Sequence, residues 1–375
     1  MLTDWLFGGK QLILRIVCAA VVAFVAVVAM SPGVIRFLIR KRLGDRPEFD
    51  HQALNELTRH KSATPTMGGI LIVPAIFAAV LLFGDLGSDY INMALFTLVW
   101  LGVLGGVDDW LKLRHAARAA AGEPTGGRHG LRMYQKILFQ IGLAVLLAVF
   151  IYSHGRTSDA VDHRAEVVNA AHSFYFPFKA DPIALPMVAY VIITAVVMVG
   201  SSNAVNLTDG MDGLAGGCVA IATGLFLAIS WVAGNDDWAK LLHMPFVPEA
   251  AELAVVCAAM IGACVGFLWY NCLPAQVFMG DTGSLPLGGL LGYIAVVTRC
   301  ELVLFIAGGV FVAEAASVLL QVGYFKATGG ERLFLCAPIH HHFHLKGWAE
   351  SKVVVRLWLV SILLAAVALA TLKLR

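Results

Sequence analysis

Long apolar stretches recur along the chain, with short polar connections between them. A helix needs about 20 apolar residues to cross a bilayer, and fewer where long polar side chains at its ends reach the interface. Ten stretches qualify on this basis, at residues 12–35, 67–84, 91–107, 136–153, 186–202, 213–233, 251–270, 284–298, 302–325 and 353–373. They fill the chain, so the pattern predicts an all-α polytopic membrane protein with residues 1–375 as a single membrane-embedded domain.

The composition agrees with this pattern and excludes other classes of protein. Of the 375 residues, 59% are hydrophobic and 14% are charged, and the mean hydropathy is +0.79. The net charge is only +2 and no basic run carries interleaved aromatic residues, so no nucleic-acid partner is expected. The seven cysteines are scattered without a CxxC pair and are interpreted as small apolar residues.

The basic residues predict which side each loop faces. Most of the 27 Lys and Arg residues fall in one alternating set of loops, at 36–66, 108–135, 203–212, 271–283 and 326–352. Cytoplasmic loops carry an excess of Lys and Arg. This set is therefore predicted to be cytoplasmic, with both termini on the outer, periplasmic side.

Five acidic residues lie at span ends on this predicted cytoplasmic side. Asp108 and Asp109 follow the third span, Asp209 and Asp212 lie between the fifth and sixth, and Asp281 precedes the eighth. A carboxylate at the bilayer centre costs about 2.5–3.5 kcal/mol, which favours the interface for these residues. Adjacent carboxylates repel unless a cation intervenes. A hard cation with oxygen ligands such as Mg²⁺ is the expected compensation.

Two of these acidic segments also have simpler interpretations. Asn206, Asp209 and Asp212 are spaced three apart, which would put them on one stripe if the segment is helical. A polar helix start would explain the same pattern. Asp281 lies in a Gly-Asp-Thr-Gly stretch, which indicates either close backbone approach to a ligand or a turn and helix cap.

Cationic side chains accompany the acids and point to phosphate chemistry. Lys61 precedes the stretch TPTMGG at 64–69, and Lys112 lies one turn after Asp108. His340, His341 and His342 stand in the last cytoplasmic loop, where a solvated or adventitious metal-binding tract is the alternative interpretation. Cations beside carboxylates and Mg²⁺ are typical of phosphoryl transfer. Glu314, Ser317 and Gln321 form a polar stripe in the ninth span, which we interpret as interhelical hydrogen bonding.

Five motifs in order along the chain resemble the phospho-N-acetylmuramoyl-pentapeptide transferases, within the polyprenyl-phosphate sugar-1-phosphate transferase family. They are KSATPTMGG (61–69), GGVDDWLK (105–112), GSSNAVNLTDGMDGLAGG (200–217), GFLWYNCLPAQVFMGDTGSLPLGG (266–289) and APIHHHFHLKGW (337–348). The resemblance implies an Mg²⁺-dependent enzyme of the bacterial inner membrane whose active site faces the cytoplasm. Its substrates would be UDP-MurNAc-pentapeptide and undecaprenyl phosphate in the membrane lipid, and its products lipid I and UMP. A homodimer is one candidate assembly.

The resemblance also assigns roles residue by residue. Asp281 is the expected Mg²⁺ ligand, while Asp108 and Asp109 would act on the lipid phosphate, with Asp108 as the base. His340, His341 and His342 complete the expected catalytic set. His344 departs from the family pattern, which usually has an acid there. The expected substrate-binding residues are Lys61, Thr66, Lys112, Asn206, Asp209, Asp212, Asn271 and Phe278.

Two other functions remain open from the sequence. Another polyprenyl-phosphate HexNAc-1-phosphate transferase would share the acids, although such enzymes usually lack the HHH segment and the TPTMGG form. A proton-coupled secondary transporter would also place acids and histidines in a helical bundle. Transporters hold such groups near the bilayer midplane, where Glu314 is the clear candidate here.

Overall fold

The computed structural model describes residues 11–40, 54–56, 61, 64–120, 130–155, 160–161, 167–168, 172–177 and 182–373. Parts of the predicted loops 36–66 and 108–135, and of the connection between the fourth and fifth spans, lie outside the described residues.

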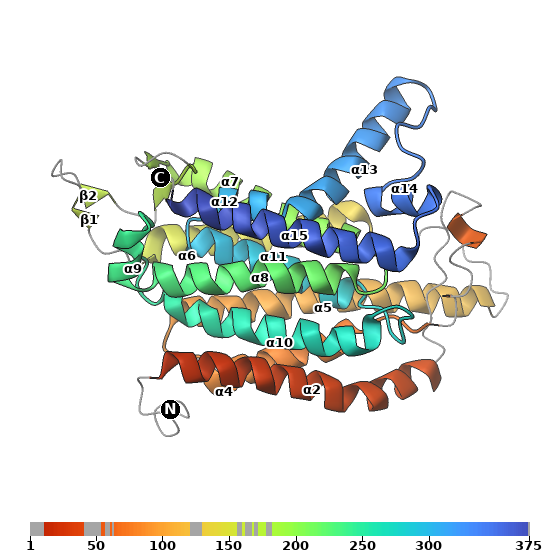
Figure 1. Ribbon diagram of the computed structural model, residues 1–375, viewed down its shortest axis with the longest axis horizontal. Coiled ribbons are helices and arrows are strands. Elements are labelled where there is room, and N and C mark those ends of the chain that lie inside the picture. Colours follow the sequence, from red (N-terminus) through yellow and green to blue (C-terminus); the bar gives the residue numbers. More distant parts are fainter. Residues whose placement is uncertain are drawn as a thin grey trace.

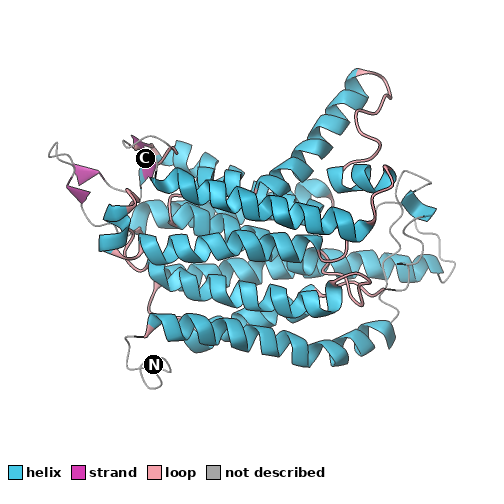
Figure 2. Cartoon of the chain, viewed as in Figure 1, coloured by secondary structure: helices cyan, strands magenta, loops and turns pink. Residues whose placement is uncertain are grey.

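Helices account for most of the described chain, and the strands form two short hairpins (Figure 2). In chain order the elements are α2 (Leu12–Arg40), α4 (Gly69–Phe83), α5 (Asp89–Ala120), α6 (Met133–His154), β1 (Ala160–Val161), β2 (Val167–Val168), β3 (Ser173–Phe174), β4 (Ile183–Ala184), α7 (Met187–Thr208), α8 (Leu214–Ala233), α9 (Asp236–Leu241), η3 (Ala250–Glu252), α10 (Leu253–Asn271), α11 (Asp281–Val297), α12 (Glu301–Ala307), α13 (Gly309–Ala327), α14 (Ile339–Leu345) and α15 (Glu350–Lys373).

The predicted all-α membrane fold is confirmed. Among the described residues, eight helices are long and apolar enough to cross a membrane, and α4 and α11 are shorter apolar helices. Together these ten helices correspond to the ten predicted spans. Figure 1 shows the helices running side by side, with the start of α2 and the end of α15 at the same end of the bundle.

Helix α11 lies at the centre of this bundle. It packs against α4, α5, α7 and α8, and all 17 of its residues are buried. Because the helix is surrounded, its first residue, Asp281, is held within protein at the end of the bundle where the polar segments gather. The packing around α11 thus fixes the position of Asp281, one of the five acids predicted at the span ends.

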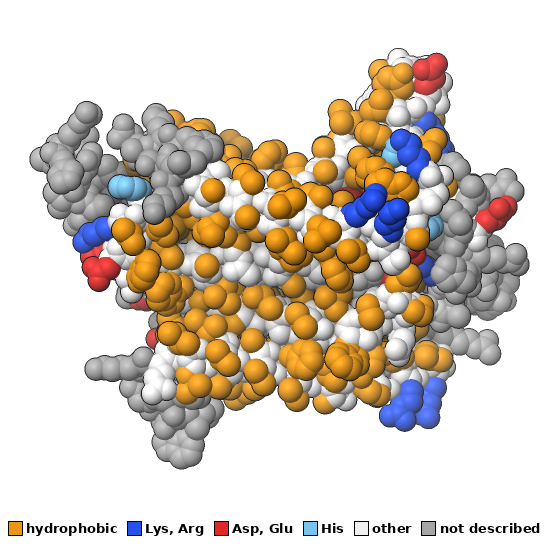
Figure 3. Space-filling model, viewed as in Figure 1, with side chains coloured by type: hydrophobic (Ala, Val, Ile, Leu, Met, Phe, Trp, Pro, Cys, Tyr) orange, Lys and Arg blue, Asp and Glu red, His pale blue; other side chains and the backbone are white. Residues whose placement is uncertain are grey.

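The outer helices carry their large apolar side chains on the outside. Leu138, Val188, Val196 and Trp269 are each about two-thirds exposed, at 66%, 71%, 67% and 66%. Figure 3 shows apolar side chains covering the visible face between the two ends, with charged groups confined to the ends. Such a belt is the surface that contacts lipid in a membrane-spanning bundle.

Two helices differ in extent from the predicted spans. The helix of the third span continues beyond residue 107 to Ala120, so both carboxylates lie inside α5. Its sequence beyond residue 107 is rich in good helix formers, so the helix extends past the apolar stretch. The ninth span is broken at Gly308, where α12 ends, and α13 leaves at a steep angle to the bundle (Figure 1).

Candidate active site

A polar pocket of about 230 Å³ opens at one end of the bundle. It collects all eight residues that the sequence predicted to bind substrate, together with Asp109 and Asp281 from the predicted catalytic set. The lining residues are Lys61, Thr66, Asp109, Lys112, Asn206, Asp209, Gly210, Met211, Asp212, Asn271, Phe278, Gly280 and Asp281. Segments more than 200 residues apart in the chain therefore share one cavity.

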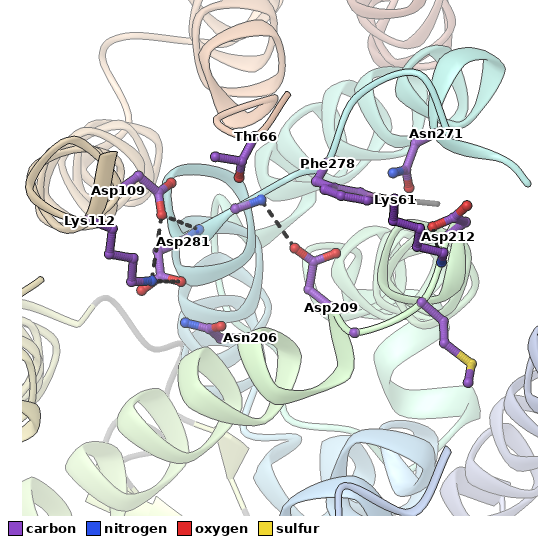
Figure 4. A pocket seen from close by; sticks show the side chains of 13 residues that line it. Lys61, Thr66, Asp109, Lys112, Asn206, Asp209, Asp212, Asn271, Phe278 and Asp281 are labelled. Carbon is purple, nitrogen blue, oxygen red and sulfur yellow. Dashed lines mark hydrogen bonds and ion pairs between the residues drawn. The ribbon is translucent and has the colours of Figure 1, made fainter. Parts of the chain in front are cut away.

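The pocket has two chemically different ends, with Asp209 between them (Figure 4). Asp109, Lys112 and Asp281 form one end, where two carboxylates and an ammonium group meet. Lys61, Asp212, Asn271 and Phe278 form the other, which adds an amide and an aromatic ring. An elongated ligand with a charged part and a planar part would match this arrangement.

Asp109 closes the start of the central helix α11. Its carboxylate accepts hydrogen bonds from the backbone N–H of Asp281 at 3.2 Å and of Thr282 at 2.9 Å, and from the Thr282 hydroxyl at 2.6 Å. The first N–H groups of a helix have no partner within it, and an acceptor near them is favoured by the helix dipole. Asp109 therefore caps α11 from a different helix and fixes Asp281 beside it.

Glycines allow the close approach that this cap requires. A Cβ atom on Gly105 would lie 2.1 Å from the Asp281 carbonyl oxygen, and one on Gly69 would lie 2.2 Å from the Gly283 nitrogen. Nearby, the TPTMGG segment pairs with the segment before α11: the Phe278 N–H donates to Pro65 at 2.8 Å, and the Gly69 N–H donates to Met279 at 2.9 Å. Two of the sequence motifs are thus joined by backbone contacts.

Asp108 is not among the residues that line the pocket, and most of its partners differ from those of Asp109. Its carboxylate is fully buried and accepts from the Leu131 N–H at 2.7 Å. The Lys112 ammonium lies 2.8 Å from Asp108 and 3.2 Å from Asp281. The same ammonium also lies 3.8 Å from Asp109.

Lys136 is a site residue that sequence reasoning missed. Its ammonium lies 2.6 Å from Asp108 and 2.6 Å from Asp281, and so bridges α5 and α11 from the first turn of α6. In the sequence it is the first residue of the predicted apolar span 136–153. One feature of the sequence could have indicated its role: Lys136 stands at the predicted cytoplasmic end of a membrane helix, the same end as the five acids.

The predicted stripe of Asn206, Asp209 and Asp212 does not form. Helix α7 ends at Thr208, and Gly213 adopts a left-handed φ of 79° before α8 begins. Only Asn206 is helical, while Asp209 accepts from the Gly280 N–H at 3.2 Å. Part of the Asp209 side chain stays exposed, yet loss of water around its carboxylate, followed by the charge of Asp281, raises its pKa well above the ordinary value.

Lys61 and Asp212 form a buried ion pair at the far end of the pocket. The Lys61 ammonium lies 2.6 Å from Asp212 and also contacts Glu350. Glu350, the first residue of α15, accepts from the Asp212 N–H at 3.0 Å. Asn271 accepts from the Gly213 N–H at 3.0 Å and donates to Val277 at 2.8 Å. Glu350 was missed because no pattern in the sequence connects it with Lys61.

His340 and His341 lie together and His342 lies apart from them, and none of the three is among the residues that line the pocket. His340 and His341 are buried in the first turn of α14. A Cβ atom on the pocket residue Gly210 would lie 2.4 Å from His340 Nε2 and 3.4 Å from His341 Nε2, so both rings stand behind this wall. His342 points elsewhere, and its Nδ1 accepts from the Leu335 N–H at 3.1 Å. Burial, followed by His340, lowers the pKa of His341 to about 2.

Asp108, Asp109 and Asp281 form a cluster that could hold a metal ion. Each offers one carboxylate oxygen, and these oxygens lie within 4.8 Å of one another. Three buried carboxylates supply the hard oxygen donors that Mg²⁺ prefers. The donor set fits a hard divalent cation better than a soft one, since neither cysteine nor histidine belongs to it.

Comparison with known proteins finds similarity over nearly the whole chain. A family model described as Glycosyl transferase family 4 matches residues 91–299, and a model described as Phospho-N-acetylmuramoyl-pentapeptide-transferase signature 1 matches residues 61–73. A phospho-N-acetylmuramoyl-pentapeptide-transferase of Desulfotalea psychrophila is 41% identical over 366 residues, covering 98% of this chain and 95% of the relative. One of Thermodesulfovibrio yellowstonii is 41% identical over 377 residues, covering 100% of this chain and 98% of the relative.

Proposed function

The chain belongs to the phospho-N-acetylmuramoyl-pentapeptide-transferase family, and we propose that it transfers phospho-MurNAc-pentapeptide from its UDP carrier to undecaprenyl phosphate. The products are lipid I and UMP, and the reaction serves peptidoglycan synthesis. The observation that carries this proposal is the pocket itself, which gathers the acids, lysines and polar side chains of the shared motifs at one end of a membrane bundle.

The location of the pocket suits a reaction between a soluble and a membrane-bound substrate. A nucleotide sugar arrives from water, whereas a polyprenyl phosphate holds its phosphate at the level of the lipid headgroups. The excess of Lys and Arg in the loops at this end supports a cytoplasmic orientation. The protein would then be a multi-pass enzyme of the bacterial inner membrane with its pocket facing the cytoplasm.

The acid end of the pocket would bind the diphosphate with Mg²⁺. Asp281 is the proposed ligand, with Asp108 and Asp109 close enough to contribute through the cluster described above. When bound, the cation supplies positive charge that polarises phosphoryl oxygens and stabilises the leaving phosphate. Lys112 and Lys136 are cations at the same end of the pocket and would offset the repulsion between two anionic substrates.

The nucleotide would occupy the other end of the pocket. Lys61, Asp212 and Asn271 provide fixed donors and acceptors, and the Phe278 ring lines the same space. Thr66, Asn206 and Asp209 lie between the two ends and would contact the part of the substrate that joins base and phosphates.

The chemistry requires that a phosphate oxygen of the lipid attack the β-phosphorus of UDP-MurNAc-pentapeptide. A P–O bond forms there, and the bond from that phosphorus to the bridging oxygen breaks, so UMP leaves with the oxygen. Asp108 is the proposed base that accepts a proton from the lipid phosphate. Asp108 shares Lys112 and Lys136 with Asp281, the proposed metal ligand, whereas the oxygens of Asp109 accept hydrogen bonds from the start of α11.

The test is incorporation of label into lipid by the purified protein. With undecaprenyl phosphate and Mg²⁺, labelled UDP-MurNAc-pentapeptide should give one labelled lipid and one UMP per turnover, whereas UDP-GlcNAc should give neither. Lipid product from UDP-GlcNAc alone would indicate a different HexNAc-1-phosphate transferase. Gradient-driven solute uptake into liposomes without any lipid product would indicate a transporter.

A further inference from the structure

Glu314 is a fully buried acid in α13 that the proposed reaction does not use. One of its oxygens, Oε2, lies 2.9 Å from Nδ1 of His340, whose side chain is also fully buried. The same oxygen lies 3.4 Å from the His340 backbone nitrogen. A buried charge is costly unless it is paired. His340 of α14 provides the partner for Glu314 of α13.

The far side of the His340 ring reaches the wall of the pocket. Within the described part of the chain, His340 Nε2 is buried and has no hydrogen-bond partner, and the same holds for Glu314 Oε1. Gly210, which lines the pocket, has no side chain to separate it from Nε2: a Cβ atom there would be 2.4 Å away. The imidazole therefore spans from Glu314 on one side to the Asp209–Gly213 turn on the other.

We propose that Glu314 is a positioning residue that holds His340 in one orientation and one tautomer. The Glu314 carboxylate accepts the Nδ1–H hydrogen bond, so Nε2 carries the lone pair and faces Gly210 as an acceptor. This inference rests on the proposed function, because Gly210, which Nε2 faces, lines the proposed substrate pocket. A substrate group that contacts the pocket wall at this point would therefore be a hydrogen-bond donor, such as a hydroxyl or amide N–H, and not a phosphate oxygen.

A carboxylate behind an imidazole is an effective way to select a tautomer. A histidine ring nitrogen that donates to a carboxylate leaves the other nitrogen as the acceptor, and the carboxylate also fixes the ring plane. Here the partner stands on α13, which leaves the bundle at a steep angle (Figure 1). The orientation of His340 is thereby linked to the position of that helix.

The test compares Glu314→Gln with a matched control one helical turn away. Ser317 is buried on the same stripe, and its hydroxyl donates to the Glu314 carbonyl at 2.7 Å, so Ser317→Ala removes a buried polar group of α13 and leaves the Glu314–His340 contact intact. In Glu314→Gln we expect kcat to fall by roughly 10–100-fold, the size of effect that a ligand-orienting partner has elsewhere. Ser317→Ala should stay near the wild-type kcat.

A second readout follows the proton directly. In protein labelled with ¹⁵N-histidine, the His340 signals, assigned by their loss in His340→Asn, should show the proton on Nδ1. In Glu314→Gln the amide can donate to Nδ1, so the proton should appear on Nε2. The double variant Glu314→Gln/His340→Asn should be no slower than His340→Asn alone, because Glu314 acts through His340.

Two results would overturn the inference: an unchanged tautomer with wild-type kcat in Glu314→Gln, or fully additive losses in the double variant. If Glu314→Gln fails to fold, Glu314→Asp keeps the charge and should retain the Nδ1–H tautomer with a smaller loss of kcat. An inactive wild-type protein would count against the proposed function, whereas the tautomer measurement on resting protein would still decide this inference.

Discussion

At the scale of single residues, the adjacent acids Asp108 and Asp109 share Lys112 but otherwise have different partners. Asp108 contacts two lysines, and Asp109 caps α11. We expect Asp108→Asn to lower kcat by roughly 10²–10⁴-fold, as loss of a general base does, with the KM for the UDP substrate nearly unchanged. Steady-state kinetics on the variant, with substrate binding measured by calorimetry, checks this. A wild-type kcat in Asp108→Asn, with Asp109→Asn inactive, would reverse the two roles.

Asp109 should contribute to stability as well as to activity. Because its carboxylate accepts three hydrogen bonds from the first turn of α11, Asp109→Ala should lower the free energy of unfolding by about 1–2 kcal/mol, the usual loss of a helix cap. Thermal unfolding in detergent measures this, with Asp108→Asn as the comparison. Equal unfolding temperatures for Asp109→Ala and wild type would show that the cap does not stabilise the helix.

Asp281 should be the acid on which cation binding depends most. Asp281→Asn keeps the size of the side chain but removes the charge that a hard cation requires, so turnover should fall by at least roughly 100-fold, equivalent to about 2.7 kcal/mol of lost stabilisation. Mn²⁺ binding followed by electron paramagnetic resonance should weaken in parallel. Normal turnover at ordinary Mg²⁺ concentration would remove Asp281 from the metal site.

At the scale of elements, two neighbouring glycines of α5 should behave differently. Gly105 faces α11, where a Cβ atom would lie 2.1 Å from the Asp281 carbonyl oxygen, whereas the nearest atom to a Cβ on Gly106 would be 3.8 Å away. We expect Gly105→Ala to separate the two helices and abolish transferase activity without removing any polar group. Gly106→Ala is the control and should remain active. Similar activity of both variants would contradict the close-approach argument.

The short helix α14 should make stability depend on pH through His341. Burial, followed by His340, lowers its pKa from 6.5 to about 2. The folded protein thus keeps this ring neutral, while the unfolded chain takes up a proton below pH 6.5, so stability is full above that pH and falls as the pH drops. Between pH 7 and pH 5 the loss should be roughly 2 kcal/mol. In His341→Gln, thermal unfolding should show a shallower decline over this range; an identical decline would show that other groups cause it.

At the scale of the whole molecule, the orientation in the membrane can be tested by labelling. Leu86 and Lys346 are exposed at opposite ends of the bundle, and the Lys and Arg distribution predicts that the end with Lys346 is cytoplasmic. In a background where Cys18, Cys272 and Cys336 are serine, Lys346→Cys should react only with reagent on the cytoplasmic side and Leu86→Cys only from outside. The reverse pattern would put the pocket on the side without nucleotide sugars.

Much of this protein could be predicted from sequence because the membrane leaves few choices. An apolar stretch of sufficient length must form a helix that satisfies its own backbone groups, so the ten helices and their alternating direction followed from the hydrophobic pattern. The acids at the span ends followed from the cost of burying charge in lipid. The eight expected substrate-binding residues were assigned by family resemblance; they line one pocket, and their roles stay predictions.

Only the tertiary structure decided which of those residues touch. The deciding contacts all join segments that are far apart in the sequence. They are Asp109 with the start of α11, Lys136 with Asp108 and Asp281, Glu350 with Lys61, and Glu314 with His340. Hydropathy and spacing describe one segment at a time, whereas these pairings depend on how closely the segments pack, which glycines such as Gly105 permit. The extension of α5 and the break at Gly308 arise likewise from local backbone preference and packing, and hydrophobicity alone does not report either of them.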